Sequence, residues 1–217
     1  MEPYCPGRSH LSRPATQNIP LIYVEPEGFQ SNCYILNRGD LAFVIDPGVE
    51  AERIIRILDE HRINKISIIL THSHADHWAG APELIKKTGC KIYMGSAAKD
   101  VCYRSEVNLA GMSGLEFPEV RGWLPDGETL SEGGMDLKII FTPGHTSCGI
   151  SLETEEGLFT GDSVFARGCG RTDLPTGDHK TLMSSIREKI LVYPPSTKLF
   201  PGHGPFTSVE AEKNLYV

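Results

Sequence analysis

Three histidines and one aspartate lie within the six residues 72–77, whose sequence is HSHADH. This segment follows the short apolar run 66–70 and Thr71, and such a run bounded by polar residues is typical of a buried strand. Imidazole nitrogens and carboxylate oxygens are ligands that Zn and Fe bind in proteins. A His-x-His pair alone is a weak signal, but the addition of Asp76 and His77 disfavours a plain solvated loop. The segment therefore predicts a metal site at the end of a strand.

Three further His or Asp residues occur in the same local context, each just after an apolar run. His145 follows the run 137–141 through Thr-Pro-Gly, Asp162 follows 157–160 through a glycine, and His203 follows 198–200 through Pro-Gly. Short apolar runs bounded by Gly and Pro favour buried strands, and loops at strand ends usually carry catalytic groups. Each of these residues alone would more often be an ordinary surface or core residue. Together with residues 72–77 they predict a metal site where four strand ends meet at one edge of a sheet.

Composition and charge narrow the class of protein. With 217 residues, 40% hydrophobic and 23% charged, the chain is long enough for one domain with a sizeable core and has an ordinary globular composition. Its net charge of −7, without any Lys/Arg block, disfavours a nucleic-acid partner. The six cysteines form no CxxC pair, the N-terminus has no apolar signal-peptide core, and no apolar run is long enough for a membrane span. We therefore expect a cytoplasmic protein with free thiols and no membrane contact, either a monomer or a homodimer.

The remaining pattern predicts one domain of the α/β (α+β) class, at residues 20–217, after an N-terminal arm at 1–19 that is rich in Pro, Ser and Arg. Strands are expected at 21–24, 32–37, 41–45, 66–70, 91–94, 126–130, 135–141, 149–153, 157–160 and 198–200. Helices are expected at 50–61, 78–87, 96–103, 180–191 and 208–214, with a mobile loop at 108–120. Two sheets packed face to face with helices outside would satisfy this order.

Asp46 and Arg171 each allow two interpretations. Asp46 stands in Asp-Pro-Gly, which is favourable turn chemistry, but its carboxylate could equally fix the hydrogen bonding of a metal ligand. The guanidinium of Arg171 could pair with a substrate carboxylate. It could instead form an internal ion pair with Asp173, and we favour this second interpretation slightly.

The pattern His-x-His-x-Asp-His, followed downstream by Thr-Pro-Gly-His, Gly-Asp and Pro-Gly-His, resembles the metallo-β-lactamase superfamily over about residues 20–214. Residues 159–165 (FTGDSVF), 168–175 (GCGRTDLP) and 201–205 (PGHGP) are similar to the short single-domain form of hydroxyacylglutathione hydrolase, or glyoxalase II. The C-terminal helical domain of full-length glyoxalase II has no counterpart in this sequence, and residues 147–148 are Ser-Cys where many relatives have Pro-Gly. The resemblance implies an αββα sandwich, with two face-to-face mixed β-sheets flanked by helices.

The resemblance also implies a binuclear metal site. Its ligands would be His72, His74 and His145 for one divalent ion and Asp76, His77 and His203 for a second, with Asp162 shared by both. Zn is the first expectation, and Fe or Mn suit the same ligands. The implied reaction is the hydrolysis of a small thioester, such as the glutathione conjugate S-lactoylglutathione, by a metal-bound hydroxide that Asp76 helps to orient.

Two other activities remain open from the sequence. A persulfide dioxygenase, which also shows the segment GCGRTD, would use a single Fe(II) on His72, His145 and Asp162, a set of two histidines and one carboxylate. A β-lactamase or lactonase-type hydrolase would use the same fold, although β-lactamases often carry a cysteine near the position of Asp162. The PGHGP segment and the complete set of seven ligand-type residues favour the thioester hydrolase.

Overall fold

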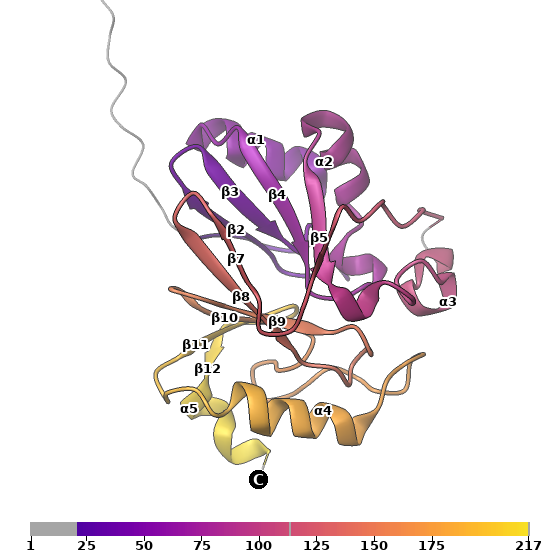
Figure 1. Ribbon diagram of the computed structural model, residues 1–217, viewed down its shortest axis with the longest axis vertical. Coiled ribbons are helices and arrows are strands. Elements are labelled where there is room, and N and C mark those ends of the chain that lie inside the picture. Colours follow the sequence, from indigo (N-terminus) through magenta and orange to yellow (C-terminus); the bar gives the residue numbers. More distant parts are fainter. Residues whose placement is uncertain (1–20, 113, 217) are drawn as a thin grey trace, which may run out of the picture.

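Two six-stranded β-sheets packed face to face form the body of the protein. The structure, a computed structural model, describes residues 21–112 and 114–216, so the N-terminal arm expected at 1–19 lies outside the described residues. Helices cover the outer face of each sheet, with α1 and α2 on one side and α4 and α5 on the other (Figure 1). The αββα sandwich of the α+β class that the resemblance implied is confirmed.

The first sheet is built from the N-terminal half of the chain. Its strands, in spatial order, are β1 (Leu21–Val24), β2 (Cys33–Arg38), β3 (Leu41–Ile45), β4 (Lys65–Leu70), β5 (Lys91–Gly95) and β6 (Gly122–Leu124). The first three strands pair antiparallel, and β3 to β6 pair parallel. Parallel neighbours need a crossover, which α1 (Ala51–His61) and α2 (Ala81–Thr88) provide for β3–β4 and β4–β5. The short helix α3 (Ser105–Asn108) lies in the longer connection to β6.

The second sheet is built from the C-terminal half. Its strands, in spatial order, are β12 (Thr207–Ser208), β11 (Lys198–Pro201), β10 (Gly157–Gly161), β9 (Ile150–Thr154), β8 (Met135–Phe141) and β7 (Thr129–Glu132). Only β10 and β11 pair parallel among the described strands of this sheet. Their crossover is α4 (His179–Ser185), which continues as a π-helical turn at Ile186–Ile190. The chain ends with α5 (Val209–Glu212) and a 3₁₀ turn at Lys213–Leu215.

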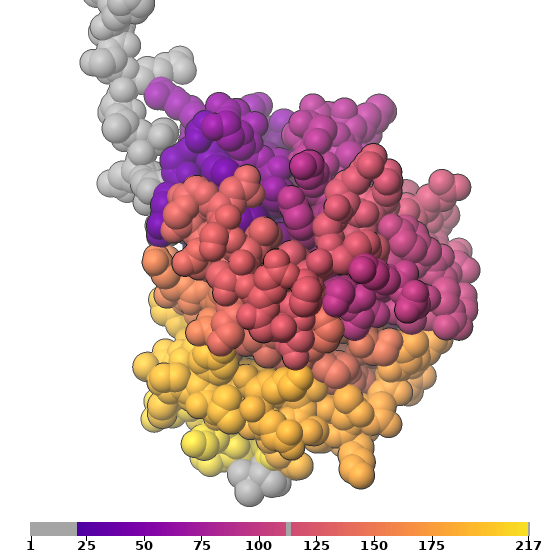
Figure 2. All heavy atoms as spheres, in the orientation of Figure 1, coloured from indigo at the N-terminus to yellow at the C-terminus, as the bar shows by residue number. Residues whose placement is uncertain are grey.

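Alternation of side chains along the strands separates three apolar layers. In β2, Ile35 packs toward the layer under α1 and α2, whereas Tyr34 and Leu36 pack into the layer between the sheets. A period of two places successive side chains on opposite faces, so a strand with both faces covered reads as a continuous apolar run. The space-filling view shows the N-terminal half above, the C-terminal segments below, and residues near 120–140 crossing between them (Figure 2).

Several predicted boundaries were wrong, one of them directly after the ligand segment and most of the others between residues 96 and 130. The helix expected from Trp78 begins at Ala81, because residues 75–77 form a 3₁₀ turn and the buried Trp78 indole N–H donates to Ser73 O at 2.7 Å. The helix expected at 96–103 is only a 3₁₀ turn at Ser96–Ala98, and the short helix α3 was not expected. The expected loop at 108–120 begins at the last residue of α3 and contains a 3₁₀ turn at Ala110–Met112. The strand expected at 126–130 is β7, which begins at Thr129. Strands β6 and β12 were missed because they have only three and two residues, too few to show an alternation of apolar and polar side chains.

No helix among the described residues is both long enough and apolar enough to span a membrane.

Candidate metal centre

Four loops bring the ligand-type side chains together at one end of the two sheets. Residues 72–77 follow β4 in the first sheet, whereas His145, Asp162 and His203 follow β8, β10 and β11 in the second. The centre therefore lies between the ends of both sheets, not at the edge of a single sheet as the spacing alone had suggested. A backbone hydrogen bond from Ile150 N to Thr71 O, 2.9 Å long, joins the two sheets beside it.

All seven ligand-type residues predicted from the sequence lie in this one cluster. They form three overlapping groups whose potential ligand atoms lie within 4.8 Å of one another: His72, His74 and His145; His72, His77 and Asp162; and Asp76, His77 and His203. Asp162 stands between the first and third groups. Its Oδ2 is 3.5 Å from His145 Nε2 and 3.7 Å from His203 Nε2, and its Oδ1 is 3.2 Å from His77 Nε2. This position suits a carboxylate shared by two ions.

Buried polar atoms without a hydrogen-bond partner gather at the same place. Within the described part of the chain, five buried side-chain nitrogen or oxygen atoms lack a well-formed hydrogen bond, and four of them belong to the cluster: His72 Nε2, His74 Nε2, His77 Nε2 and Asp162 Oδ1, of which the last two lie 3.2 Å apart as an ion pair. A buried polar group without a partner costs free energy, so native proteins seldom keep several together. Imidazole nitrogen and carboxylate oxygen are also a chemically suitable donor set for Zn or Fe. The residues present therefore fit a metal centre.

Asp46 sets the tautomers of two histidines in the cluster. Its Oδ2 accepts from His77 Nδ1 at 2.9 Å and from the Thr71 hydroxyl at 2.6 Å, and its Oδ1 accepts from Thr71 N at 2.8 Å. Because a carboxylate only accepts, neutral His77 keeps its proton on Nδ1, so Nε2 is the nitrogen that can bind a metal. The Thr71 oxygen, having donated its own proton, accepts from His72 Nδ1 at 3.2 Å, which leaves His72 Nε2 free in the same way.

Asp46 thus combines the two roles that the sequence left open. Its backbone has a φ of +50°, in the left-handed region that aspartate tolerates better than most residues, and Gly48 N donates to its carbonyl at 2.8 Å. Turn chemistry therefore shapes the backbone, while the carboxylate holds His77 directly and His72 through the Thr71 hydroxyl. The role of Thr71 was missed, and the only signal was its place between the strand and the ligand segment.

Arg171 contributes through its backbone as well as its side chain. Its guanidinium makes two 2.7 Å contacts with the exposed Asp173 carboxylate, which is the internal ion pair that we favoured. Its main-chain carbonyl accepts from His145 Nδ1 at 2.7 Å and leaves His145 Nε2 facing the centre. Sequence reasoning missed this second contact, because a backbone carbonyl leaves no trace in residue type.

Electrostatics divide the histidines into neutral and charged sets when no ion is present. Burial, reinforced by neighbouring imidazoles, holds the pKa of His72 well below its usual value and lowers that of His74 to about 4. Burial also opposes charge on His77, but Asp162, Asp46 and Asp76 together hold its pKa well above the usual value. Two ligands are therefore already neutral at pH 7, whereas an ion must displace a proton from His77.

Asp76 is the predicted catalytic residue, and it lies at the more open side of the cluster. Its Oδ2 is 3.0 Å from His203 Nε2 and 3.9 Å from His77 Nε2, and its side chain is 35% exposed. Burial opposes its ionisation, yet His77 and His203 keep the pKa of Asp76 below its usual range. The carboxylate is therefore an acceptor at neutral pH, able to hold a proton-bearing oxygen that enters from solvent.

Glycines allow the loops to approach one another closely. A Cβ on Gly202 would lie 2.2 Å from Asp162 Oδ1 and 2.6 Å from His77 Cε1, and one on Gly48 would lie 1.8 Å from the Asp76 carbonyl oxygen. These distances are shorter than van der Waals contact, so only glycine fits without displacement. The glycines beside the ligands are thus a packing requirement of the centre.

We expect Gly202→Ala to weaken metal binding by about ten- to a hundredfold, the range found when a residue supporting a ligand is changed. The added methyl must displace the Asp162 carboxylate or the His77 ring. Isothermal titration with Zn²⁺ would measure the loss. Gly168→Ala is the matched control, because a Cβ there meets nothing within 4 Å. Equal affinity in the two variants would contradict the close packing at Gly202.

The family model described as Metallo-beta-lactamase superfamily matches residues 26–203. Hydroxyacylglutathione hydrolase GloC of Haemophilus influenzae is 39% identical over 206 residues, covering 90% of this chain and 95% of that protein. The crystal structure of the BLEG-1 B3 metallo-beta-lactamase matches with a TM-score of 0.81 and 29% identity, over 89% of this chain and 96% of the other. The structure of TTHA1623 in a di-iron-bound form matches with a TM-score of 0.78 and 28% identity, over 89% and 98%.

Proposed function

Because the chain belongs to the metallo-beta-lactamase superfamily, we propose that it is a binuclear metal-dependent hydrolase of small thioesters such as S-lactoylglutathione. The observation that carries this proposal is the complete cluster of seven ligand-type residues, with Asp162 placed between two groups of histidines. The 39% identity to a protein named hydroxyacylglutathione hydrolase supports the thioester substrate.

Two groups of side chains would hold the ions. His72, His74 and His145 form one group, Asp76, His77 and His203 form the other, and Asp162 is within reach of both. Zn is the proposed metal, while the di-iron form of a structural relative shows that iron suits this fold as well. Bound divalent ions would lower the pKa of a water molecule and polarise a carbonyl group.

The chain's own residues then have two tasks. Asp46 and the Arg171 carbonyl keep the histidine protons on Nδ1, so that His77 and His145 present Nε2 to the centre. Asp76, ionised and partly exposed, accepts a hydrogen bond from the attacking water and orients it. A thiol has a pKa of about 8.5, so a thiolate can leave near neutral pH without a strong acid to protonate it. The site therefore suits a thioester better than an amide, whose leaving amine needs a proton.

The test is the hydrolysis of S-lactoylglutathione by protein loaded with Zn²⁺, monitored through the loss of thioester absorbance. We expect a kcat/KM of about 10⁴ M⁻¹s⁻¹ or more, within the usual enzyme range, and its loss after treatment with a chelator. A parallel assay measures oxygen uptake with glutathione persulfide and Fe²⁺-loaded protein. Oxygen uptake without thioester turnover would favour the persulfide dioxygenase, and inactivity in both assays would favour another ester, lactone or β-lactam substrate.

A further inference from the structure

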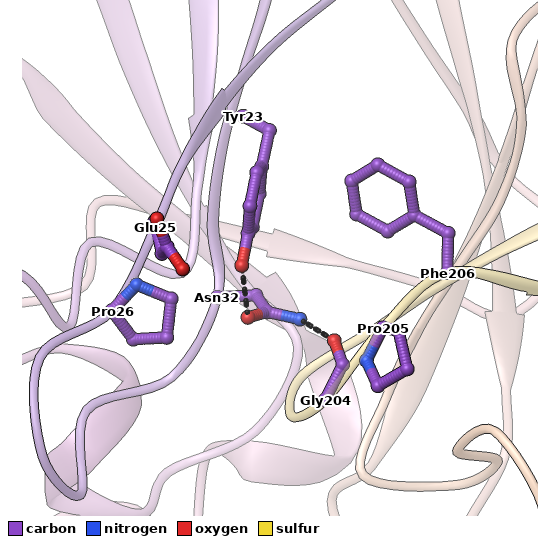
Figure 3. Close-up of a pocket in the computed structure, with 7 residues that line it drawn as sticks. All are labelled: Tyr23, Glu25, Pro26, Asn32, Gly204, Pro205 and Phe206. Carbon is purple, nitrogen blue, oxygen red and sulfur yellow. Dashed lines mark hydrogen bonds between the residues drawn. The ribbon is translucent and has the colours of Figure 1, made fainter.

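Asn32, at the entrance to β2, holds the loop that carries His203. The residue is 1% exposed and makes three hydrogen bonds to this loop. Its backbone N donates to Gly202 O at 2.7 Å, and its Nδ2 donates to Pro201 O and to Gly204 O, both at 2.9 Å. The bond to Gly204 is visible in the close-up (Figure 3). The carbonyls that accept from Asn32 therefore lie on both sides of His203 in the chain.

Two tyrosines fix the orientation of the Asn32 amide. The Tyr23 hydroxyl donates to Asn32 Oδ1 at 3.0 Å, so the amide oxygen faces Tyr23 and its nitrogen faces the loop (Figure 3). The Tyr34 hydroxyl also donates to Pro201 O, at 2.7 Å, and accepts from Asn32 Nδ2 at 3.2 Å. Burial and the nearby Glu25 raise the pKa of Tyr23, so its hydroxyl keeps its proton at neutral pH. The amide cannot rotate by half a turn without losing these bonds.

His203 is the ligand-type histidine that packing holds least. Its side chain is 33% exposed, whereas those of His77 and His145 are 0% and 7% exposed. The carboxylates of Asp76 and Asp162 are its polar contacts, and both belong to the proposed ligand set. An open pocket of about 460 Å³, lined by Tyr23, Asn32 and Gly204 among others, lies beside the loop (Figure 3). Its ring also meets those of His77 and Phe165 edge-on, at centroid distances of 5.3 and 6.0 Å, and of these two residues His77 belongs to the proposed ligand set. Because its ring is partly exposed, the position of His203 depends strongly on its backbone.

We propose that Asn32 is a positioning residue that places His203 by binding the carbonyls on either side of it, and so determines how tightly the second of two ions is retained. Asn32 touches neither the ligand atoms nor the reacting groups. It acts through the backbone of residues 201–204. The inference rests on the proposed two-ion function and deepens it, because it assigns to one residue a selective effect on the Asp76, His77 and His203 group.

The test compares Asn32→Leu with the wild type in titrations with Zn²⁺ and with Co²⁺. Leucine has a similar size but no side-chain donor for the carbonyls of Pro201 and Gly204. We expect the variant to bind the first ion with unchanged affinity and the second at least tenfold more weakly. The Co²⁺ absorption spectrum should lose the component that appears with the second equivalent. Turnover at one equivalent of metal should match the wild type at the same loading, because the first site is undisturbed.

Asn108→Leu is the matched control, since Asn108 is another buried asparagine whose side chain bonds Cys102 O and Ala110 N away from the cluster. Asn108→Leu should lower thermal stability without changing the ratio of the affinities for the first and the second ion. Tyr23→Phe provides a second, milder variant that removes only the donor to Asn32 Oδ1, and it should weaken the second ion in the same direction.

Three outcomes would overturn the inference. Equal second-ion affinity in Asn32→Leu and wild type, or in Tyr23→Phe and wild type should Asn32→Leu not fold, would show that the loop needs no such support. If Asn32→Leu weakened the binding of both ions equally, without separating the two affinities, Asn32 would have only a general role in stability. A wild-type protein that binds only one ion would overturn the two-ion function itself, which separates the failure of the premise from the failure of the inference.

Discussion

Asp162→Ala is expected to abolish retention of the second ion, to weaken the first, and to lower kcat/KM by about a thousandfold or more. Asp162 lies within 3.7 Å of histidines from both groups, so its loss removes a donor from each. Charge stabilisation by a bound ion is worth several kcal/mol in the transition state, and each 1.4 kcal/mol is about a factor of ten in rate. Metal content after dialysis and thioester turnover would measure the two losses.

Stability measurements separate the loss of a ligand from the loss of the fold. Without metal, the buried Asp162 carboxylate pairs with His77 at 3.2 Å, which offsets the cost of burying its charge, and His77 keeps its bond to Asp46 in the variant. We therefore expect the chelator-treated variant to unfold within a few degrees of the chelator-treated wild type. Added Zn²⁺ should raise the Tm of the wild type and leave that of Asp162→Ala nearly unchanged. Full activity and metal content in the variant would contradict the assignment of Asp162.

Asp46→Asn is expected to weaken binding of the ion at the His77 group by about ten- to a hundredfold, with a similar fall in turnover. The amide keeps one acceptor, but its NH₂ group replaces the oxygen that accepts from His77 Nδ1. His77 must then accept at Nδ1 and carry its proton on Nε2, where the metal should bind. Asparagine tolerates the φ of +50° at this position, so the backbone should remain unchanged.

Thr71→Val is the matched comparison for Asp46→Asn. It removes the hydroxyl between Asp46 and His72 while leaving the contact between Asp46 and His77 intact. We expect it to affect the group that contains His72, and Asp46→Asn to affect both groups. Titration of the two variants with Zn²⁺ would distinguish them, and identical effects of both substitutions would contradict separate control of the two tautomers.

The ligand-type residues could be predicted from the sequence because they are local and repeated. Residues 72–77 concentrate four of them directly after a strand, and the three distant ones each follow a short apolar run that ends in Gly or Pro. Hydrophobic periodicity likewise located most strands, since a strand buried on both faces reads as an unbroken apolar run. The helix start expected at Trp78 failed because an indole buried under the ligand segment looks, in sequence, like the apolar face of a helix.

The sequence offered Asp46 as a supporting residue, but the partners of most supporting contacts could not be predicted, because these contacts join residues that are distant in the chain. The Asp46 carboxylate meets His77 across 31 positions, and Asn32 meets Pro201 across 169. The Arg171 carbonyl that orients His145 is a backbone atom, present in every residue type, so no pattern marks it. These partners come together only in the folded chain, where the two sheets pack face to face (Figure 1).

The sequence by itself determined which side chains can bind metal, that they stand at strand ends, and that the chain resembles one superfamily. Local spacing and residue chemistry are sufficient for these conclusions. Only the tertiary structure decided that the cluster spans the ends of both sheets, that Asp162 lies between the two groups, and which nitrogen each of His72, His77 and His145 presents. Those features depend on hydrogen bonds and close backbone approaches between segments that are far apart in the chain, and such contacts exist only in the folded molecule.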